Sequence, residues 1–137
     1  MISPTERMIV ETDGAIGWMV FNNPARRNAI SRDMWEAIPV IVEHFERDPA
    51  VRVIVLKGAG DKAFISGADI SQFEEQRASP EAVERYEAIA ERAHARLQGS
   101  TKPTIAMIHG FCMGGGVGVA LSCDLRLASA AAKRRAV

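Results

Sequence analysis

Apolar positions along the chain fall into short β-branched runs and longer helical repeats, and the two kinds of segment alternate. Residues 7–12 and 15–21 predict two strands. Asp13-Gly14 between them predicts a type I′ hairpin turn, because that turn requires positive φ at both central positions. Three further strands are predicted at 51–56, 104–108 and 124–128. The first of these, Val-Arg-Val-Ile-Val-Leu, is typical of a central strand that is buried on both faces.

Helical spacing predicts the elements between these strands. Ser31 precedes an apolar repeat that contains Pro39 and extends to about Arg47, and the proline predicts a kink rather than a break. Residues 79–97 predict a second helix, opened by a serine cap and a proline, and residues 114–122 predict a short third helix. The alternation of strand and helix indicates the α/β fold class with a mostly parallel sheet.

Composition and charge narrow the functional classes. The chain has 137 residues, 47% of them hydrophobic, and 17 basic side chains balance 17 acidic ones, so we expect a soluble globular protein. Zero net charge disfavours a nucleic-acid partner, since phosphate neutralisation supplies most of that affinity. Glycines interrupt the apolar segment 104–121, which favours strand, turn and helix over a membrane span, and no signal peptide is visible. Two cysteines without a disulfide pattern indicate a reducing compartment, and we expect a cytoplasmic protein.

Two turns are candidates for chemistry because each exposes successive backbone N–H groups. The first is Ile65-Ser66-Gly67-Ala68-Asp69, at the end of a predicted loop over 57–69, and the second is Gly114-Gly115-Gly116 before the short helix. Convergent amides from two turns form an oxyanion hole, which stabilises charge on a carbonyl oxygen. The alternative is that both are only tight turns. No phosphate-loop or dinucleotide motif is present.

The isolated histidines, cysteines and methionines give weaker signals. His109 near the second turn is expected to be packed or hydrogen-bonded, while His44 and His94 lie on charged helix faces and are expected to be solvated. Cys112 has no base placed beside it. Met107 and Met113 could line packed or acyl-binding surface, and core packing is the expectation for both. Without ligand spacing among Cys and His, no metal site is predicted.

Four segments, in this order and spacing, resemble the enoyl-CoA hydratase/isomerase family, also called the crotonase superfamily. They are Asn-Asn-Pro-Ala-Arg-Arg-Asn-Ala-Ile at 22–30, Val-Arg-Val-Ile-Val-Leu-Lys-Gly-Ala-Gly at 51–60, Ala-Phe-Ile-Ser-Gly-Ala-Asp-Ile at 63–70, and 102–126 with its Lys-Pro-Thr-Ile-Ala, His-Gly, Gly-Gly-Gly and Cys-Asp-Leu-Arg. The resemblance covers the chain to about Ser129. It implies a spiral of ββα units and a substrate held as an acyl-CoA thioester, with no separate cofactor. It also implies a homo-oligomer, either a trimer or a dimer of trimers.

The same resemblance assigns site residues. The backbone amides of Ala68 and Gly115 would form the oxyanion hole that stabilises an enolate. The coenzyme A arm would lie against Arg26, Arg27, Ala29, Ser66, Gly67, Ala68, Asp69 and Ile70. Basic side chains suit the phosphates, although Arg26 and Arg27 are equally well read as solvated surface charges. For Asp69 a role in holding its loop is preferred to a catalytic one.

The departures from the family pattern concern the acid/base groups. The first catalytic glutamate of the hydratases corresponds to Gly118, and the second lies in a segment beyond Cys-Asp-Leu-Arg that is not found here. Hydration is therefore disfavoured, while isomerisation, hydrolysis and decarboxylation stay open. We expect residues 1–129 to be the N-terminal part of a crotonase-like domain, truncated before its C-terminal half, and 130–137 to be an atypical tail without a strand pattern. The alternative is an inactive protein that at most binds CoA or associates with other subunits.

Overall fold

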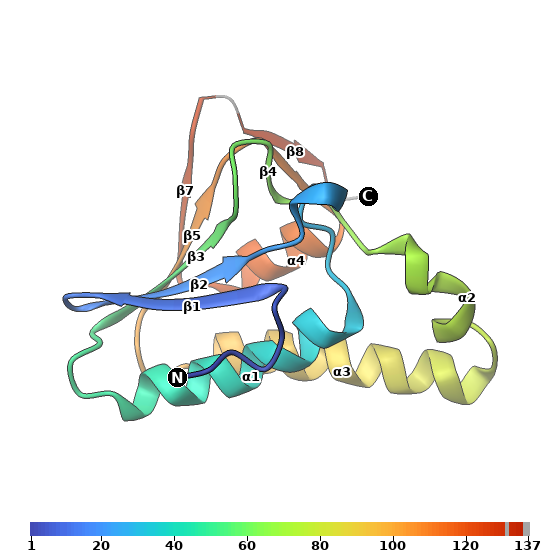
Figure 1. Cartoon of the computed structure of the whole chain (residues 1–137), viewed down its shortest axis with the longest axis horizontal. Coiled ribbons are helices and arrows are strands. Elements are labelled where there is room, and N and C mark those ends of the chain that lie inside the picture. Colours follow the sequence, from blue (N-terminus) through green and yellow to red (C-terminus); the bar gives the residue numbers. More distant parts are fainter. Residues whose placement is uncertain (131, 136–137) are drawn as a thin grey trace.

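The strands form two sheets. The computed structural model describes residues 1–130 and 132–135. A five-stranded sheet has the order β1-β2-β3-β5-β7, and a small sheet has the order β4-β6-β8 (Figure 1). The strands are β1 Met8–Asp13, β2 Ile16–Phe21, β3 Val53–Gly58, β4 Ala63–Ile65, β5 Thr104–Ile108, β6 Phe111–Met113, β7 Leu125–Ala128 and β8 Lys133–Arg135. Only the β1–β2 pair is antiparallel among these strands, so the α/β class with a mostly parallel sheet is confirmed.

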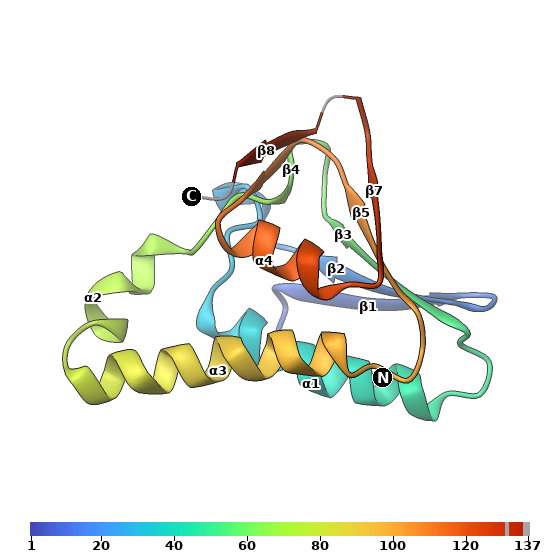
Figure 2. The same ribbon diagram turned by 180° about the vertical axis from the view of Figure 1, so that it is seen from behind.

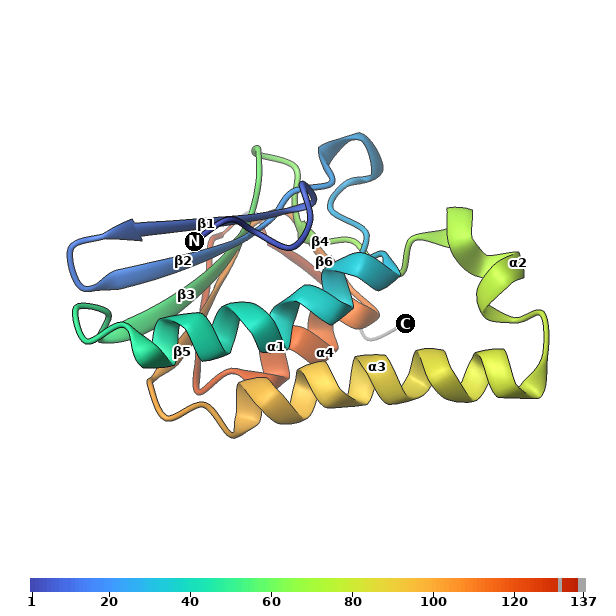
Figure 3. The same ribbon diagram turned by 60° about the horizontal axis from the view of Figure 1, so that its bottom comes forward.

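The helices are η1 Pro24–Arg26, α1 Arg32–Arg47, η2 Ile70–Gln72, α2 Phe73–Gln76, α3 Pro80–Gln98 and α4 Gly115–Ser122. Helix α1 packs on the large sheet, α4 contacts strands of both sheets, α3 packs on α1 and α4, and α2 contacts α3. Helices α1 and α3 run side by side (Figure 3), and α4 lies between α3 and the strands when the molecule is seen from behind (Figure 2). None of the helices in the described residues is both long and apolar enough to cross a bilayer.

The core is formed by side chains of strand β3 and of one face of α1. Ile54, Val55 and Leu56 are all buried, which confirms the prediction of a central strand. Gly17 on β2 permits this packing, because a Cβ there would lie 2.8 Å from the ring of Phe45 on α1. The large sheet and α1 therefore meet at a glycine, with the aromatic ring filling the space above it.

Most predicted elements are confirmed at nearly the predicted bounds. Ser31 caps α1, the helix continues through Pro39, and the Ser79 hydroxyl accepts a hydrogen bond from the Ala82 N–H at 3.1 Å at the start of α3. The hairpin is also confirmed, but its turn differs. Positive φ is found only at Gly14 (58°), and the loop is Gly14-Ala15, so the prediction of type I′ at Asp13-Gly14 is wrong.

The small sheet was not predicted. Segment 57–69 is not wholly a loop, because β4 lies within it and pairs in parallel with β6. Strand β8 lies in the segment 130–137, for which no strand pattern was expected, and it pairs with β6 in register Phe111 to Lys133. Strand β8 is therefore part of the small sheet.

Candidate active site

The first candidate turn is held in place by a bridge to the segment before α1. Gly67 has φ of 142°, a backbone conformation that favours glycine, and its carbonyl accepts a hydrogen bond from the Ile30 N–H at 2.8 Å. The Asp69 N–H in turn donates to the Ile30 carbonyl at 2.9 Å. These two hydrogen bonds form a parallel β-bridge between Ile30 and Ala68, in which the groups that pair with Ile30 belong to Gly67 and Asp69, the residues on either side of Ala68. The N–H of Ala68 therefore faces away from Ile30, and the residue is exposed.

The second candidate turn opens helix α4. Gly114 has φ of 50°, and Gly115 is the first helical residue, so its N–H is among the amides that the helix itself does not pair. A Cβ on Gly116 would lie 2.4 Å from the Ile65 carbonyl of β4, which shows how closely the helix approaches that strand. Because Ile65 leads directly into the turn at Ala68, the structure brings the two predicted turns next to each other.

Asp69 holds its loop, as the sequence favoured. The carboxylate is 3% exposed and accepts hydrogen bonds from the Ser71 hydroxyl at 2.7 Å and the Asn23 amide at 3.3 Å. Arg26 forms an ion pair with it at 3.6 Å. Burial raises the pKa of Asp69, but the hydrogen bonds from Ser71 and the charge of Arg26 outweigh that effect, and the pKa lies below its usual value. The carboxylate is charged and fully engaged.

The remaining residues predicted to contact coenzyme A lie around η1. Arg27 (φ 51°) places its guanidinium over the Phe111 ring, 4.9 Å from the centroid, and half of the Arg26 side chain is exposed. The Ser66 hydroxyl donates to the Arg26 carbonyl at 3.2 Å, which ties the first turn to η1. Ile70 is 74% exposed, whereas Ala29 is buried, and its N–H donates to the Arg26 carbonyl at 3.1 Å while its carbonyl accepts from the Asn23 side-chain amide at 2.9 Å.

Asn28 organises this region and was not singled out from the sequence as a site residue. It is buried, and its side-chain amide donates to the carbonyls of Ala59 (3.0 Å) and Ala63 (2.8 Å) while its oxygen accepts from the Asn23 N–H at 2.9 Å. Its φ is 57°, a backbone conformation that asparagine adopts more readily than most residues.

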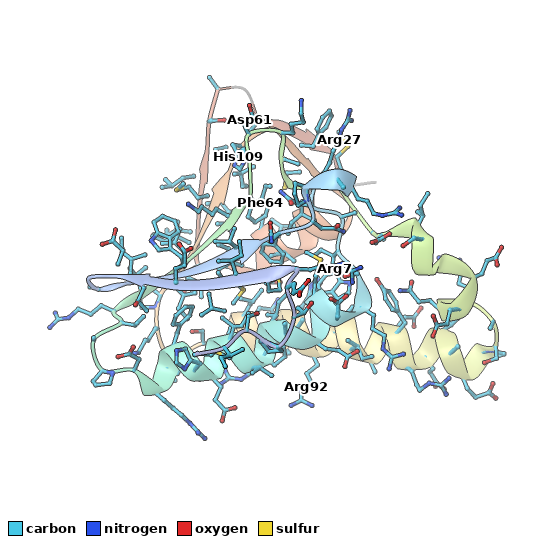
Figure 4. All side chains as sticks on the ribbon, viewed as in Figure 1. Arg7, Arg27, Asp61, Phe64, Arg92 and His109 are labelled. Carbon is cyan, nitrogen blue, oxygen red and sulfur yellow. The ribbon has the colours of Figure 1, made fainter. Side chains whose placement is uncertain are left out.

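Figure 4 shows Arg27, Asp61 and His109 at one end of the molecule and Arg92 at the opposite side.

A cavity of about 310 Å³ lies beside Ala68. Its lining comes from the first turn, from the end of α2 and from α3: Ala68, Gln76, Arg77, Val83, Tyr86 and Glu87. The Tyr86 hydroxyl accepts a hydrogen bond from the Trp35 indole at 2.9 Å, and burial raises the pKa of this hydroxyl. The Trp35 ring also packs on Gly115, since a Cβ there would lie 3.3 Å from it. One aromatic pair thus connects the cavity at Ala68 with the second turn.

His94 contradicts the prediction that it is solvated. Its ring stacks on the Trp35 indole, with the centroids 5.1 Å apart and the planes at 26°, and it lies against Gly118 of α4. Burial lowers the pKa of His94, and the carboxylate of Glu91 offsets only part of that effect. The residue faces other helices because its position continues the helical stripe from Tyr86 through Ala90, each four residues apart.

The other weak candidates behave as packed or structural groups, with one exception. Nε2 of His109 lies 3.0 Å from the Gly60 carbonyl oxygen, which confirms the prediction that His109 is packed or hydrogen-bonded. Cys112 and Cys123 are buried and are not joined in a disulfide, and burial raises the pKa of Cys123 to about 11. Met107 is 38% exposed, so the expectation that it packs in the core is wrong. Over residues 1–130 and 132–135, no group of three His, Cys, Asp or Glu side chains is placed to hold a metal ion.

The structure is thus an α/β fold in which two glycine-containing turns lie next to each other, beside a cavity that Ala68 and Tyr86 help to line. The sequence profile described as "Enoyl-CoA hydratase/isomerase" matches residues 11–136. The chain belongs to the enoyl-CoA hydratase/isomerase family, and its fold is the α/β crotonase fold.

Known proteins agree with this assignment. The chain is 33% identical over 126 residues to a short-chain-enoyl-CoA hydratase of Clostridium acetobutylicum, covering 92% of this chain and 48% of that protein. It is 36% identical to a mitochondrial 3-hydroxyisobutyryl-CoA hydrolase of Rattus norvegicus, over 91% of this chain and 33% of the hydrolase. The crystal structure of an enoyl-CoA hydratase/isomerase family protein from Hyphomonas neptunium superposes with a TM-score of 0.93 at 39% identity, covering 97% of this chain and 51% of that one. The chain thus spans about half the length of the hydratase and of the crystallised protein.

Proposed function

We propose that the chain is an acyl-CoA thioester enzyme that stabilises an enolate in an oxyanion hole. The backbone N–H groups of Ala68 and Gly115 would donate hydrogen bonds to the thioester oxygen and stabilise the negative charge that develops on it. The observation that carries this proposal is the contact between the two turns, in which the first turn of α4 packs on the backbone of β4 directly before Ala68. Each turn presents an amide that its own local structure leaves unpaired.

The coenzyme A arm is proposed to lie along η1 and the first turn. Arg26 and Arg27 would supply positive charge for the phosphates, and the segment from Ser66 to Ile70, in which Ala68 and Ile70 are exposed, would supply contacts for the pantetheine arm. The acyl group would enter the cavity beside Ala68. Family resemblance further suggests a role in fatty acid metabolism and a homo-oligomer, a trimer or a dimer of trimers, in the cytoplasm.

The reaction follows from enolate stabilisation and from the groups that surround it. Gly118 places no carboxylate on α4, so hydration is the least supported reaction, and isomerisation, hydrolysis and decarboxylation all begin from or pass through a stabilised oxyanion. The relatives named above include both a hydratase and a hydrolase, which agrees with a shared oxyanion hole and variable acid/base groups.

Exchange of the α-protons of butyryl-CoA in deuterated buffer, followed by NMR, tests the proposal directly. Ala68→Pro removes the N–H that the bridge to Ile30 does not use, and Ala68→Gly is the matched control that keeps it. We expect the proline variant to lose about 10²- to 10³-fold in exchange rate. Equal rates in a folded Ala68→Pro variant and in the Ala68→Gly control would refute the oxyanion hole.

Binding of coenzyme A is tested separately by calorimetry. Arg26→Gln and Arg27→Gln are expected to weaken binding of butyryl-CoA, because each removes a charge near the proposed phosphate position. Arg92→Gln removes a charge from the opposite side of the molecule (Figure 4) and is expected to leave the Kd unchanged. Equal effects of all three variants would show that the arm does not lie along η1.

A second candidate is a protein without catalytic activity that binds CoA or associates with other subunits. Three exposed leucines on α4 and β7 favour it: Leu121 (66%), Leu125 (59%) and Leu127 (59%). Apolar side chains gathered on an edge strand and its neighbouring helix are typical of an interface. Analytical ultracentrifugation decides, because a monodisperse monomer with measurable α-proton exchange would exclude this candidate.

A further inference from the structure

The helix that opens with the candidate oxyanion amide carries no ionisable side chain of its own. Its sequence is Gly-Gly-Val-Gly-Val-Ala-Leu-Ser, yet an imidazole from another helix lies directly against it. A Cβ built on Gly118 would lie 2.7 Å from Cε1 of His94 and 3.5 Å from its Nε2. The imidazole therefore fills the space that a side chain at position 118 would take.

His94 and the amide of Gly115 share a neighbour. The Trp35 indole stacks on the imidazole and also packs against Gly115, and it donates a hydrogen bond to Tyr86, which lines the cavity at Ala68. The histidine thus belongs to the same aromatic cluster as the wall of the candidate site. His44 and His109 do not, because the first packs on Phe45 and the second binds the Gly60 carbonyl.

The other ionisable groups near the site are less suited to accept a proton. Asp69 is buried and committed to Ser71, Asn23 and Arg26, and the Tyr86 hydroxyl is engaged by the Trp35 indole. Glu87 lines the cavity from an exposed position. His94 combines contact with α4, partial burial and a titratable nitrogen.

The surroundings of the imidazole also favour one tautomer. The Ser122 hydroxyl donates its hydrogen to the Gly118 carbonyl at 2.8 Å, so its oxygen is left as an acceptor, 3.5 Å from Nδ1 of His94. A proton on Nδ1 leaves Nε2 with its lone pair. Among the charged groups, Glu91 on α3 is the one that acts on His94, while α1 presents the Trp35 ring and α4 presents no charge. Burial lowers the pKa of His94, which favours the neutral form of the ring.

We propose that His94 is the acid/base residue of this site, a role that rests on the function proposed above. Nε2 takes a proton from the α-carbon of the acyl group, and the electron pair of that C–H bond forms the carbon–carbon double bond of the enolate. The carbonyl π pair moves onto the oxygen, where the N–H groups of Ala68 and Gly115 hold it. The imidazolium then returns its proton to the α-carbon, or to the γ-carbon of an unsaturated chain, which moves the double bond.

Proton exchange into butyryl-CoA in deuterated buffer, together with the Kd of butyryl-CoA, tests the role of His94. His94→Gln is expected to lower the exchange rate by about 10²- to 10⁴-fold while changing the Kd by less than about threefold. Free imidazole is expected to restore exchange in His94→Ala, and the limb of the pH–rate profile that reflects protonation of His94 should be absent from His94→Gln. A purely structural role would produce neither the rescue nor the change in profile.

Further results separate the role of His94 from the proposed function. His44→Gln removes an imidazole elsewhere on the molecule and should leave exchange unchanged. Three outcomes would overturn the role of His94 but not the binding of the thioester. They are full exchange in His94→Gln, loss of exchange only in Glu87→Gln, and tight binding without exchange by the unaltered chain. Failure of the unaltered chain to bind butyryl-CoA would overturn the proposed function itself, and the role of His94 with it.

Discussion

Replacing Gly118 with alanine tests the contact between α4 and His94 without reference to any ligand. The new Cβ would lie 2.7 Å from Cε1 of His94, which is shorter than the 3.0 Å below which one of the two groups must move. The imidazole is held by its stack on Trp35, so movement disturbs a second contact. Overpacking of this kind costs about 1–3 kcal/mol.

Alanine also has a favourable effect that acts in the opposite direction. Gly118 is in the interior of α4, where alanine is the better helix former by about 1 kcal/mol. The net change in the free energy of unfolding for Gly118→Ala is therefore expected to be a loss of about 1 kcal/mol. In a His94→Ala background the clash is absent, and the same substitution should instead add about 1 kcal/mol.

Urea denaturation followed by circular dichroism measures all four corners of this double-mutant cycle. The two substitutions should show a coupling energy of about 2 kcal/mol. A matched cycle with His44→Ala in place of His94→Ala should show none, because His44 packs on Phe45 instead. If Gly118→Ala changes the stability equally in the presence and in the absence of His94, the imidazole does not occupy the space above Gly118.

Three further substitutions test the scaffold of the site. Gly116→Ala should destabilise the fold by about 3 kcal/mol in urea titration, because its Cβ would meet the Ile65 carbonyl, a backbone group that cannot rotate away. Asn28→Ala should cost about 4 kcal/mol by the same measurement, since it removes three hydrogen bonds to buried and part-buried backbone groups and places alanine at φ 57°. Hydrogen bonds from Arg96 lower the pKa of Glu46 from 4.5 to about 2, so the Glu46 carboxylate stabilises the fold above pH 4.5 and loses this effect as the pH falls towards 2. Glu46→Gln should abolish about 1–2 kcal/mol of acid-dependent stability in urea titrations between these pH values.

Each of these substitutions has a control in the chain. Gly99→Ala places a Cβ 3.2 Å from a carbonyl at the end of α3, and it should cost far less than Gly116→Ala. Asn22→Ala removes a single exposed hydrogen bond to Glu6. Glu43→Gln removes an exposed carboxylate paired with Arg47 and should leave the acid dependence intact. A control that matches its partner variant would refute the corresponding contact.

The sequence predicted the large sheet and its helices because their segments are long enough to show a period. Strand β3 presents a continuous β-branched run, and α1 and α3 each carry a serine at the cap. Strands β4, β6 and β8 have three residues each, which is too short for any period. Their formation depends on pairing with one another, a long-range interaction that no local pattern shows.

Different physical causes determine how much of the site was predictable. The two turns were visible because glycine is required where the backbone has positive φ, as at Gly67 and Gly114. The role of Asp69 in its loop followed from its position. His94 was misplaced because its neighbours along the chain are charged, whereas its environment comes from Trp35 on another helix. The spacing of four from Tyr86 was the one local sign that this position faces inward.

The position of His94 changes the meaning of a glycine at 118. A carboxylate missing from α4 suggests an inactive protein only if acid/base groups must come from α4, but the cavity beside Ala68 is lined by residues of α3, the helix that carries His94. Glycine is the residue that leaves room for an imidazole to approach the helix at this point, because any Cβ would displace it. Gly118 and His94 therefore form one structural unit, and the first substitution to examine in any test of activity is the histidine rather than the glycine.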